Sequence, residues 1–224
     1  AASDVYKRQS IYNEYYEFIS GGLRPQRQDG KLYERSIPMP LEENIPVRSL
    51  VEFGRVQWNT SVDDWFSFRS PNSFSCFPEA FELRRKGDGY TFFAGAGESF
   101  YLTFDFLEQI VGFPYFTITA PEGTQIELIV QESHQPHGEN ILLDTTFHCW
   151  SRFICKEGEN RFQAFDFESA KWMQLHITAF SDGEISLQKL GVLRRKYPFE
   201  QKPIVCVKDP EMQRLFDAGI NTIY

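Results

Sequence analysis

The chain has 224 residues, of which 42% are hydrophobic and 16% aromatic, including 22 Phe. This apolar content excludes a disordered chain, and the abundance of Phe favours broad sheet faces packed against one another. The formal net charge of −8 opposes general nucleic-acid binding, and the sequence has no run of about 18 apolar residues that would predict a membrane span.

The N-terminal segment differs from the rest of the chain. Residues 4–9 (DVYKRQ) can be back-translated as GATGTGTATAAGAGACAG, which looks like a transposon end sequence used in preparing sequencing libraries. We therefore interpret residues 1–9 as an adapter artefact and exclude them from the fold. Residues 10–34 lack clear periodicity, and residues 35–47 contain closely spaced prolines that forbid a helix. We expect residues 10–47 to hold the end of a preceding domain and a Pro-rich linker.

Residues 48–200 show the alternation of β-strands. Phe100, Leu102 and Phe104 alternate with more polar residues, and the same period of two recurs at 126–131, 147–155 and 172–177. No helical stretch between these segments is long enough for a parallel crossover. The pattern predicts an all-β domain, an antiparallel β-sandwich of the concanavalin or jelly-roll kind. The predicted inner face includes Phe104, Ile118, Leu128, Phe153 and Leu175.

The last segment, residues 201–224, predicts a hinge followed by a short helix. Asp209 is a good N-cap, Pro210 fits the first helical position, and Glu211 suits the positive end of the helix dipole. Apolar residues then recur at helical spacing, at Met212, Leu215, Phe216, Gly219, Ile220 and Ile223. This stripe needs a partner, so we expect Leu215, Phe216 and Ile220 to be loosely docked or exposed.

Four segments, in order, resemble the β-sandwich region of bacterial α-L-rhamnosidases. They are residues 102–118 (LTFDFLEQIVGFPYFTI), 120–132, 165–172 (FDFESAKW) and 204–215 (IVCVKDPEMQRL). The chain departs from the family at Leu107, where the family often has Gly, and in 165–172, where a Gly and an Arg are missing. The resemblance covers about half of the chain, mostly residues 95–224.

The resemblance implies an accessory domain with no catalytic residue of its own. The family's catalytic carboxylates lie in a helical barrel, which would follow Tyr224 and would begin with the helix predicted at 210. The intact enzyme would hydrolyse terminal α-L-rhamnosides with inversion. The expected partners are therefore that helical domain of the same chain and rhamnose-containing glycans.

Two polar groupings invite a catalytic or metal-binding interpretation. Asp166 and Glu168 lie two apart on a predicted strand, which would place their carboxyls on one face about 7 Å apart. We interpret them as a half-solvated strand edge and not as a glycosidase pair. A short loop carries Glu132, His134, His137 and Glu139, and we expect a solvated polar loop there in place of a zinc site. No cofactor or metal is predicted.

The cysteines match neither a zinc framework nor a disulfide scaffold. Their spacings are irregular, and their number is small for a chain of this length, so we expect free thiols. They are Cys76, Cys149, Cys155 and Cys206.

Weak ligand-binding candidates share the polar side of two predicted strands. They are His148, Trp150, Arg152, Trp172, Gln174 and His176. Exposed indoles can pack on the CH faces of sugar rings while polar neighbours hold the hydroxyls, which would make an independent carbohydrate-binding module. The alternative that we favour is an outer face covered by a neighbouring catalytic domain. A protein-interaction sandwich of a cell-surface protein is a third possibility.

Overall fold

The computed structural model describes residues 38–59, 74–137, 150–199 and 204–223. The chain divides into two units, Ala1–Pro38 and Met39–Tyr224, and every element described below belongs to the second. The predicted adapter segment and residues 10–34 lie outside the described residues. Strands dominate the described part, all pairings between them are antiparallel, and a single helix follows. This confirms the prediction of an all-β sandwich with a short C-terminal helix.

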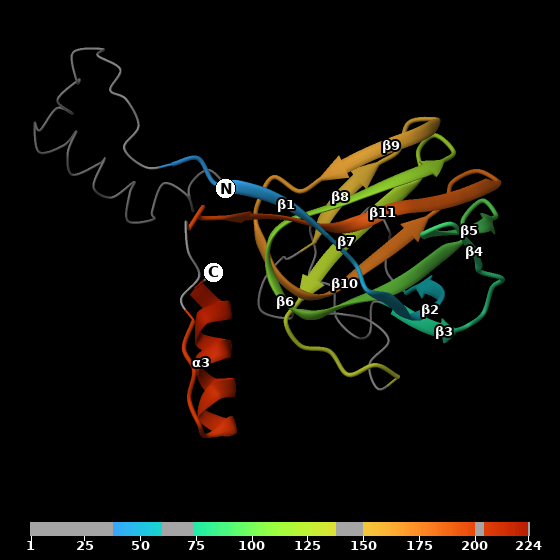
Figure 1. Cartoon of the computed structure of the whole chain (residues 1–224). Coiled ribbons are helices and arrows are strands. Elements are labelled where there is room, and N and C mark those ends of the chain that lie inside the picture. Colours follow the sequence, from blue (N-terminus) through green and yellow to red (C-terminus); the bar gives the residue numbers. More distant parts are fainter. Residues whose placement is uncertain (1–37, 60–73, 138–149, 200–203, 224) are drawn as a thin grey trace, which may run out of the picture. The chain divides into compact units, whose positions relative to one another are not determined.

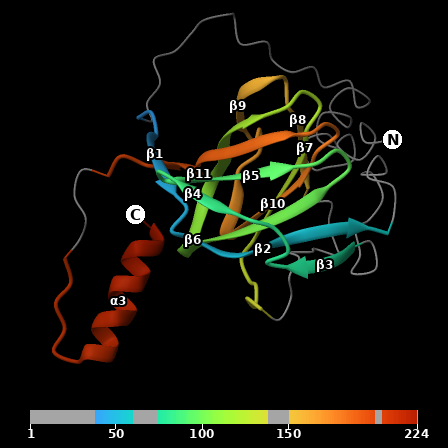
Figure 2. The ribbon, with the colours of Figure 1, turned by 90° about the vertical axis from the view of Figure 1, so that its right-hand side faces the viewer.

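The strands form two facing sheets that share β6 (Ser99–Ala120) (Figure 1). The second part of β6 belongs to sheet A, in the order β4-β5-β11-β6-β9, with β1 beside the end of β11. The other strands of sheet A are β1 (Leu41–Pro46), β4 (Arg84–Lys86), β5 (Gly89–Ala94), β9 (Gly158–Gln163) and β11 (Gly183–Lys196). In Figure 2, β4, β5 and β11 lie above β2 and β3.

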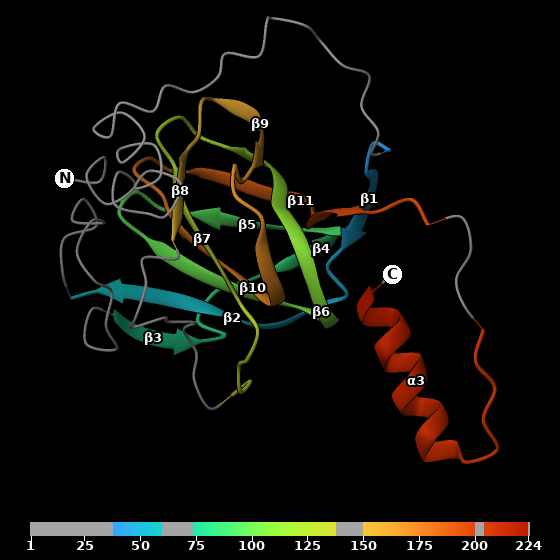
Figure 3. The same ribbon diagram turned by 90° about the vertical axis from the view of Figure 1, so that its left-hand side faces the viewer.

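Sheet B contains the first part of β6, in the order β3-β2-β6-β10-β7-β8. Figure 3 shows β2 and β3 at the side of the sandwich opposite β9 and β11. The other strands of sheet B are β2 (Ser49–Trp58), β3 (Phe74–Pro78), β7 (Gln125–Gln131), β8 (Ser151–Ile154) and β10 (Glu168–Thr178).

The strand β6 passes from one sheet into the other near Gly112. Residues 99–112 pair with β10 in sheet B, whereas residues 113–119 pair with β11 in sheet A. A Cβ atom at Gly112 would collide with the carbonyl oxygen of Leu193 and would lie 2.5 Å from Cγ1 of Val192. Glycine is therefore required where β6 approaches the backbone of β11.

The core lies between the two sheets, as the alternation predicts. Phe104, Ile118, Leu128 and Leu175 are at most 2% exposed, and each points inward from its strand. Phe153 is half-buried and packs edge-on against Phe116, with ring centroids 5.3 Å apart. The predicted inner face is thus confirmed.

The sandwich begins earlier than predicted. The Pro-rich segment expected to be a linker supplies β1, whose residues pair with β11 from Leu41↔Lys196 to Pro46↔Gly191. Prolines are tolerated there because Pro38 and Pro40 precede the strand and Pro46 ends it, on an edge with one pairing partner. Ion pairs reinforce the pairing, with 2.8 Å between Glu42 and Arg195 and 2.8 Å between Glu43 and Arg194.

Two predicted strands, β8 and β10, can be compared with the structure only where it describes them. β8 comprises only Ser151–Ile154 in the described part, while Phe147 and Cys149 lie outside the described residues. β10 begins at Glu168, and residues 165–166 form a bend that leaves the Phe165 side chain 98% exposed. The prediction that Asp166 and Glu168 share a strand face is therefore wrong, because the chain turns there between β9 and β10.

The C-terminal helix α3 (Pro210–Ile223) begins where its cap predicts. Asp209 Oδ1 accepts the N–H of Glu211 at 2.8 Å and that of Met212 at 3.2 Å. Leu215 and Phe216 are exposed, as expected, and Ile220 is half-buried. None of the helices in the described part of the chain has the length and apolarity needed to span a bilayer.

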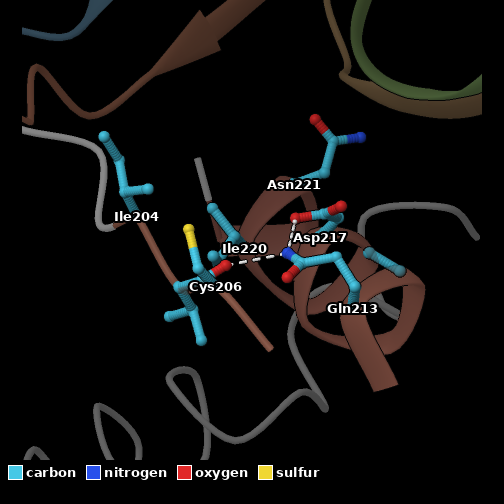
Figure 4. Close-up of a pocket in the computed structure, with 8 residues that line it drawn as sticks. Ile204, Cys206, Gln213, Asp217, Ile220 and Asn221 are labelled. Carbon is cyan, nitrogen blue, oxygen red and sulfur yellow. Dashed lines mark hydrogen bonds between the residues drawn. The ribbon is translucent and has the colours of Figure 1, made fainter. Parts of the chain in front are cut away.

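A shallow cleft separates α3 from the segment that precedes it. Gln213 ties the two together, since its Nε2 donates to Val205 O and its Oε1 accepts from the N–H of Val207, both at 2.8 Å. Ile204, Cys206 and Ile220 are among the residues that line this cleft, and Figure 4 shows Cys206 beside Ile220. Gln213 also donates to Asp217 Oδ1 at 2.9 Å, so the amide of this side chain is fully used in local contacts.

Leu107 interrupts β6 with an unusual backbone conformation. Its φ is +74°, in the left-handed region that favours glycine, and its N–H donates to Asp105 Oδ1 at 2.8 Å. The pairing of β6 with β10 shifts register at this point, so the residue lies in a bulge. Leu107 is also the position where the resembling family often has Gly.

We expect Leu107→Gly to raise the free energy of unfolding by about 0.5–1 kcal/mol, because glycine adopts a positive φ without steric cost. The Leu107 side chain is 59% exposed, so its removal sacrifices little packing. Urea denaturation measures the change. Leu107→Ala is the control, since it shortens the side chain but keeps the Cβ atom. A gain of the same size in both variants would contradict the backbone explanation.

Gly112→Ala, at the point where β6 passes from sheet B to sheet A, should lower the free energy of unfolding by about 1–3 kcal/mol, because the added methyl group overlaps the β11 backbone. Gly95→Ala provides the control, since its nearest neighbour is the flexible carboxyl end of Glu98 at 3.2 Å. Thermal unfolding of both variants measures the difference. Equal stability of the two would show that β6 has room to shift at the crossing.

Candidate functional site

The predicted ligand-binding residues lie on the outer face of sheet B, which points away from the core. Gln174 is paired with Thr103 on β6 and Ile129 on β7, and its side chain shares their face of the sheet. We expected this face either to be exposed or to be covered by a neighbouring catalytic domain, but Thr103, Gln174 and His176 are at most 1% exposed within the sandwich itself. Alternation identifies which residues share a face but not how deeply that face is covered, so the depth of burial could not be predicted.

Most of the predicted residues come together. The ring of His176 lies between two indoles, with centroids 4.7 Å from Trp150 and 6.2 Å from Trp58. Trp172 is 9% exposed, and it shares an apolar cluster with Ile129 and Trp150. His148 lies outside the described residues. The structure thus places Trp150, Arg152, Trp172, Gln174 and His176 on one continuous surface of sheet B.

A chain of hydrogen bonds runs across this face from β10 to β6. Gln174 Nε2 donates to Thr103 Oγ1 at 2.6 Å, and Gln174 Oε1 lies 2.7 Å from His176 Nε2. Because the amide oxygen of Gln174 can only accept, His176 donates through Nε2 in this arrangement. A second chain joins Trp58 Nε1 to Ser99 Oγ at 3.0 Å, and Ser99 to Thr178 at 2.8 Å.

Buried charges on this face are paired. Arg152 Nη2 donates to Glu127 Oε1 at 2.5 Å, with side chains 10% and 4% exposed. His134 Nε2 lies 2.7 Å from Glu52 Oε2, with side chains 0% and 3% exposed. Removing one member of such a pair would leave the other charge or polar group buried without compensation.

Glu52 ties the loop after β7 to the sheet. Its second oxygen accepts the N–H of His137, and the His134 ring stacks edge-on against Trp172 at 5.3 Å. The expectation of a solvated loop is therefore wrong for His134, because a long-range partner on β2 draws its side chain inward. Within the described residues, no His, Cys, Asp or Glu side chains gather in threes to hold a metal ion. Glu139 lies outside them.

The cysteines of the described part are free thiols, as predicted. Cys76 packs beside Tyr101 on the outer face of sheet B, and burial raises the pKa of Cys76 to about 11. Burial likewise raises the pKa of Cys155 to about 12, and Cys206 is exposed. The half-buried Cys76 and the buried Cys155 are therefore protonated at neutral pH and are poor nucleophiles. Cys149 is outside the described residues.

Asp166 lies in the bend before β10, and Glu168 is the first residue of that strand. Partial burial raises the pKa of Glu168, and the nearby charge of Asp166 raises it further. The bend at residues 165–166 leaves Phe165 exposed, and the exposed Phe167 meets Phe113 edge-on at 6.3 Å.

Sequence reasoning missed several members of this face. The signal that could have identified them is a period of two in residues 52–58. It places on one face of a strand the residues Glu52, Gly54, Val56 and Trp58. The pairing of Glu52 with His134 joins residues 82 positions apart and leaves no local signal.

What this face can do chemically follows from its contacts. Amide, hydroxyl and imidazole groups of this face hydrogen-bond to one another, and the two buried carboxylates hold basic partners. The buried Tyr101 hydroxyl and His134 Nδ1 have no hydrogen-bond partner within the described residues. The hydrogen-bonded network stabilises a particular register of β2, β6, β7 and β10. A sugar could use the same groups only by displacing these internal bonds.

Comparison with known proteins adds structural neighbours. No family model and no curated protein matches the chain. The fold is similar to a GH78 family rhamnosidase of Bacillus sp. GL1, with a TM-score of 0.49 and 16% identity over 62% of this chain and 16% of that one. It is also similar to a rhamnosidase from Klebsiella oxytoca, with a TM-score of 0.49 and 11% identity over 82% of this chain.

A third neighbour is the module TmCBM61 in complex with β-1,4-galactotriose, with a TM-score of 0.33 and 11% identity over 64% of this chain and 87% of that one. The chain spans only 16% and 35% of the lengths of the two rhamnosidases. The structural neighbours thus include rhamnosidases and a carbohydrate-binding module.

The buried network can be tested by Gln174→Leu, which should lower the free energy of unfolding by about 1–3 kcal/mol because Thr103 and His176 lose a common partner. A double-mutant cycle with Thr103→Val should give a coupling energy of about 1 kcal/mol. Gln163→Leu, on the exposed side of β9, is the control and should change stability by less than about 0.5 kcal/mol. Additive effects in the cycle would mean that the two side chains are not coupled.

Proposed function

We propose that residues 39–199 form a non-catalytic accessory β-sandwich of a glycoside hydrolase, and that this enzyme is an α-L-rhamnosidase. The observation that carries the proposal is the backbone at Leu107. The φ of +74° there is the conformation that a glycine would favour, and glycine is what the rhamnosidase motif often has at that position. The local structure therefore agrees with the alignment of the motif, although the residue itself differs.

The contacts of the outer face support a role in structure over one in catalysis. Glu52 and Glu127 are the buried carboxylates of this face, and each is paired with a basic side chain. A glycosidase needs one carboxyl group free to donate a proton and a second free to attack or to activate water. Charges held in buried pairs do not suit either task.

The proposed partner of the sandwich is a helical catalytic domain of the same polypeptide, for which residues 201–224 provide the hinge and first helix. The exposed stripe of Leu215 and Phe216 on α3 suits packing against further helices. Rhamnose-containing glycans would be substrates of that domain.

An independent carbohydrate-binding module is the second candidate. The observation that favours it is the gathering of Trp58, Trp150 and Trp172 on one face beside amide and imidazole groups. The burial of Gln174 and His176 weighs against it, since a sugar platform must be accessible. Titration of the chain with rhamnose, followed by tryptophan fluorescence, separates the two. The accessory role predicts an unchanged spectrum, whereas saturable quenching would favour the module.

A protein extended through the proposed helical domain should release rhamnose from an aryl α-L-rhamnoside. In that protein, Asp166→Asn combined with Glu168→Gln should leave the rate within a few-fold of the parent, because neither carboxyl belongs to a catalytic arrangement. Initial-rate measurements on both proteins test this. A loss of about a thousand-fold would make the pair catalytic, and a folded but inactive extended protein would remove the rhamnosidase assignment.

A further inference from the structure

A second cleft, separate from the outer face of sheet B, opens where three connections of the sandwich meet. The turn from β1 to β2, the turn from β4 to β5, and the bulge of β11 between Gln188 and Gly191 surround it. Its volume is about 490 Å³, within the range of small-molecule sites.

The cleft has an apolar floor and tyrosine walls. Val47, Leu50 and Leu190 line its depth, and Leu190 is itself a core residue at 4% exposure. Tyr90 and Tyr115 form the walls, and Tyr90 rests on Phe104 with ring centroids 5.9 Å apart. The Tyr115 hydroxyl lies against Gly191. Any residue with a Cβ atom at position 191 would bring that atom to 2.7 Å from the hydroxyl oxygen, so glycine makes room for the tyrosine. Both rings are half-buried, so they offer fixed aromatic surfaces.

The rim of the cleft is cationic in a chain whose net charge is −8. Arg48, Arg85 and Lys189 line it, and within the described residues none of the three has a carboxylate within 4.0 Å. Other basic side chains of the sandwich do have such partners, among them Arg55, Arg152, Arg161, Arg194 and Arg195. Asp88 is the one acidic residue among those lining the cleft, so the rim carries an excess of positive charge that a concave surface concentrates.

Lys189 reaches the rim through a strained backbone. Its φ is +45°, and it lies in the bulge where the pairing of β11 with β6 shifts register. A lysine has a Cβ atom that disfavours this conformation, and nothing in the core needs its side chain, which is exposed. Strained residues of this kind gather at binding sites, where an outlier is a reason to look for a ligand.

We infer that this cleft binds a carboxylated sugar, a hexuronate unit of a glycan. A guanidinium group donates two parallel hydrogen bonds to a carboxylate, an ammonium group adds a third donor, and tyrosine rings suit the CH face of a pyranose. A phosphate would use the same cations but would gain nothing from the tyrosine walls. The choice of a glycan rests on the proposed function, whereas the preference for an acidic ligand rests on the rim alone.

Calorimetric titration of the full chain tests the inference, with digalacturonate as the acidic probe and galactobiose as its neutral match. We expect binding of digalacturonate only, with an affinity that falls as the salt concentration rises. Arg48→Gln combined with Arg85→Gln should weaken binding by about tenfold or more. Arg161→Gln, which removes a cation paired with Glu159 on β9, is the control and should bind as the parent does.

Lys189→Gly keeps the test independent of misfolding, because it removes a cation while relieving the left-handed strain. It should be at least as stable as the parent and should bind digalacturonate several-fold more weakly. Unchanged affinity in both cleft variants, equal binding of galactobiose, or no binding of digalacturonate at millimolar concentration would each overturn the inference. Displacement of digalacturonate by an equal concentration of inorganic phosphate would show a general anion site and would also overturn it.

The two proposals can fail separately. If the extended protein hydrolyses an aryl rhamnoside but the chain does not bind digalacturonate, the rhamnosidase assignment stands and the uronate site is excluded. Binding of digalacturonate by a chain whose extended form is inactive on rhamnosides would do the reverse.

Discussion

The passage of β6 from one sheet to the other is the constraint on which the rest of the sandwich depends. A single strand pairs with β2 and β10 in its first part and with β9 and β11 in its second, so it sets the separation and register of both sheets. Gly112 permits the close approach to β11 at the crossing, and Leu107 adopts a left-handed conformation in the bulge just before it. The outer face of sheet B and the cleft beside the bulge of β11 both follow from this geometry.

On sheet B, the crossing brings β6 between β2 and β10 and thereby places Thr103 beside Gln174. Internal hydrogen bonds on this face join Thr103, Gln174 and His176, and both of its buried carboxylates, Glu52 and Glu127, are paired with basic side chains. On sheet A, the bulge of β11 that follows the crossing carries Lys189 to the rim of a cleft whose cations have no carboxylate partners among the described residues. The charged groups on the outer face of sheet B are paired with one another, whereas the cations of the cleft are not paired with carboxylates in the described part. For this reason we assign a structural role to the face and ligand binding to the cleft.

Much of the fold could be predicted from local pattern, and the site could be predicted only in part. Alternation placed Phe104, Leu128 and Leu175 inside, and capping chemistry placed the start of α3 at Pro210, because these signals lie within a few residues of one another. The same alternation brought Trp150, Trp172 and His176 onto one face. It could not show that this face is buried, that β1 joins β11 across the chain, or that Glu52 holds His134, since each depends on partners remote in sequence.

We propose that the tryptophan-bearing face of sheet B is structural and that the sandwich is an accessory domain. Nuclear magnetic resonance spectra of the ¹⁵N-labelled chain test it most directly, because the indole N–H signals of Trp58, Trp150 and Trp172 report on that face. We expect saturating L-rhamnose to leave these three signals unchanged, whereas digalacturonate should shift the backbone amides of Arg48, Arg85 and Lys189. Saturable shifts of the indole signals on addition of rhamnose, with no change at the cleft, would contradict it.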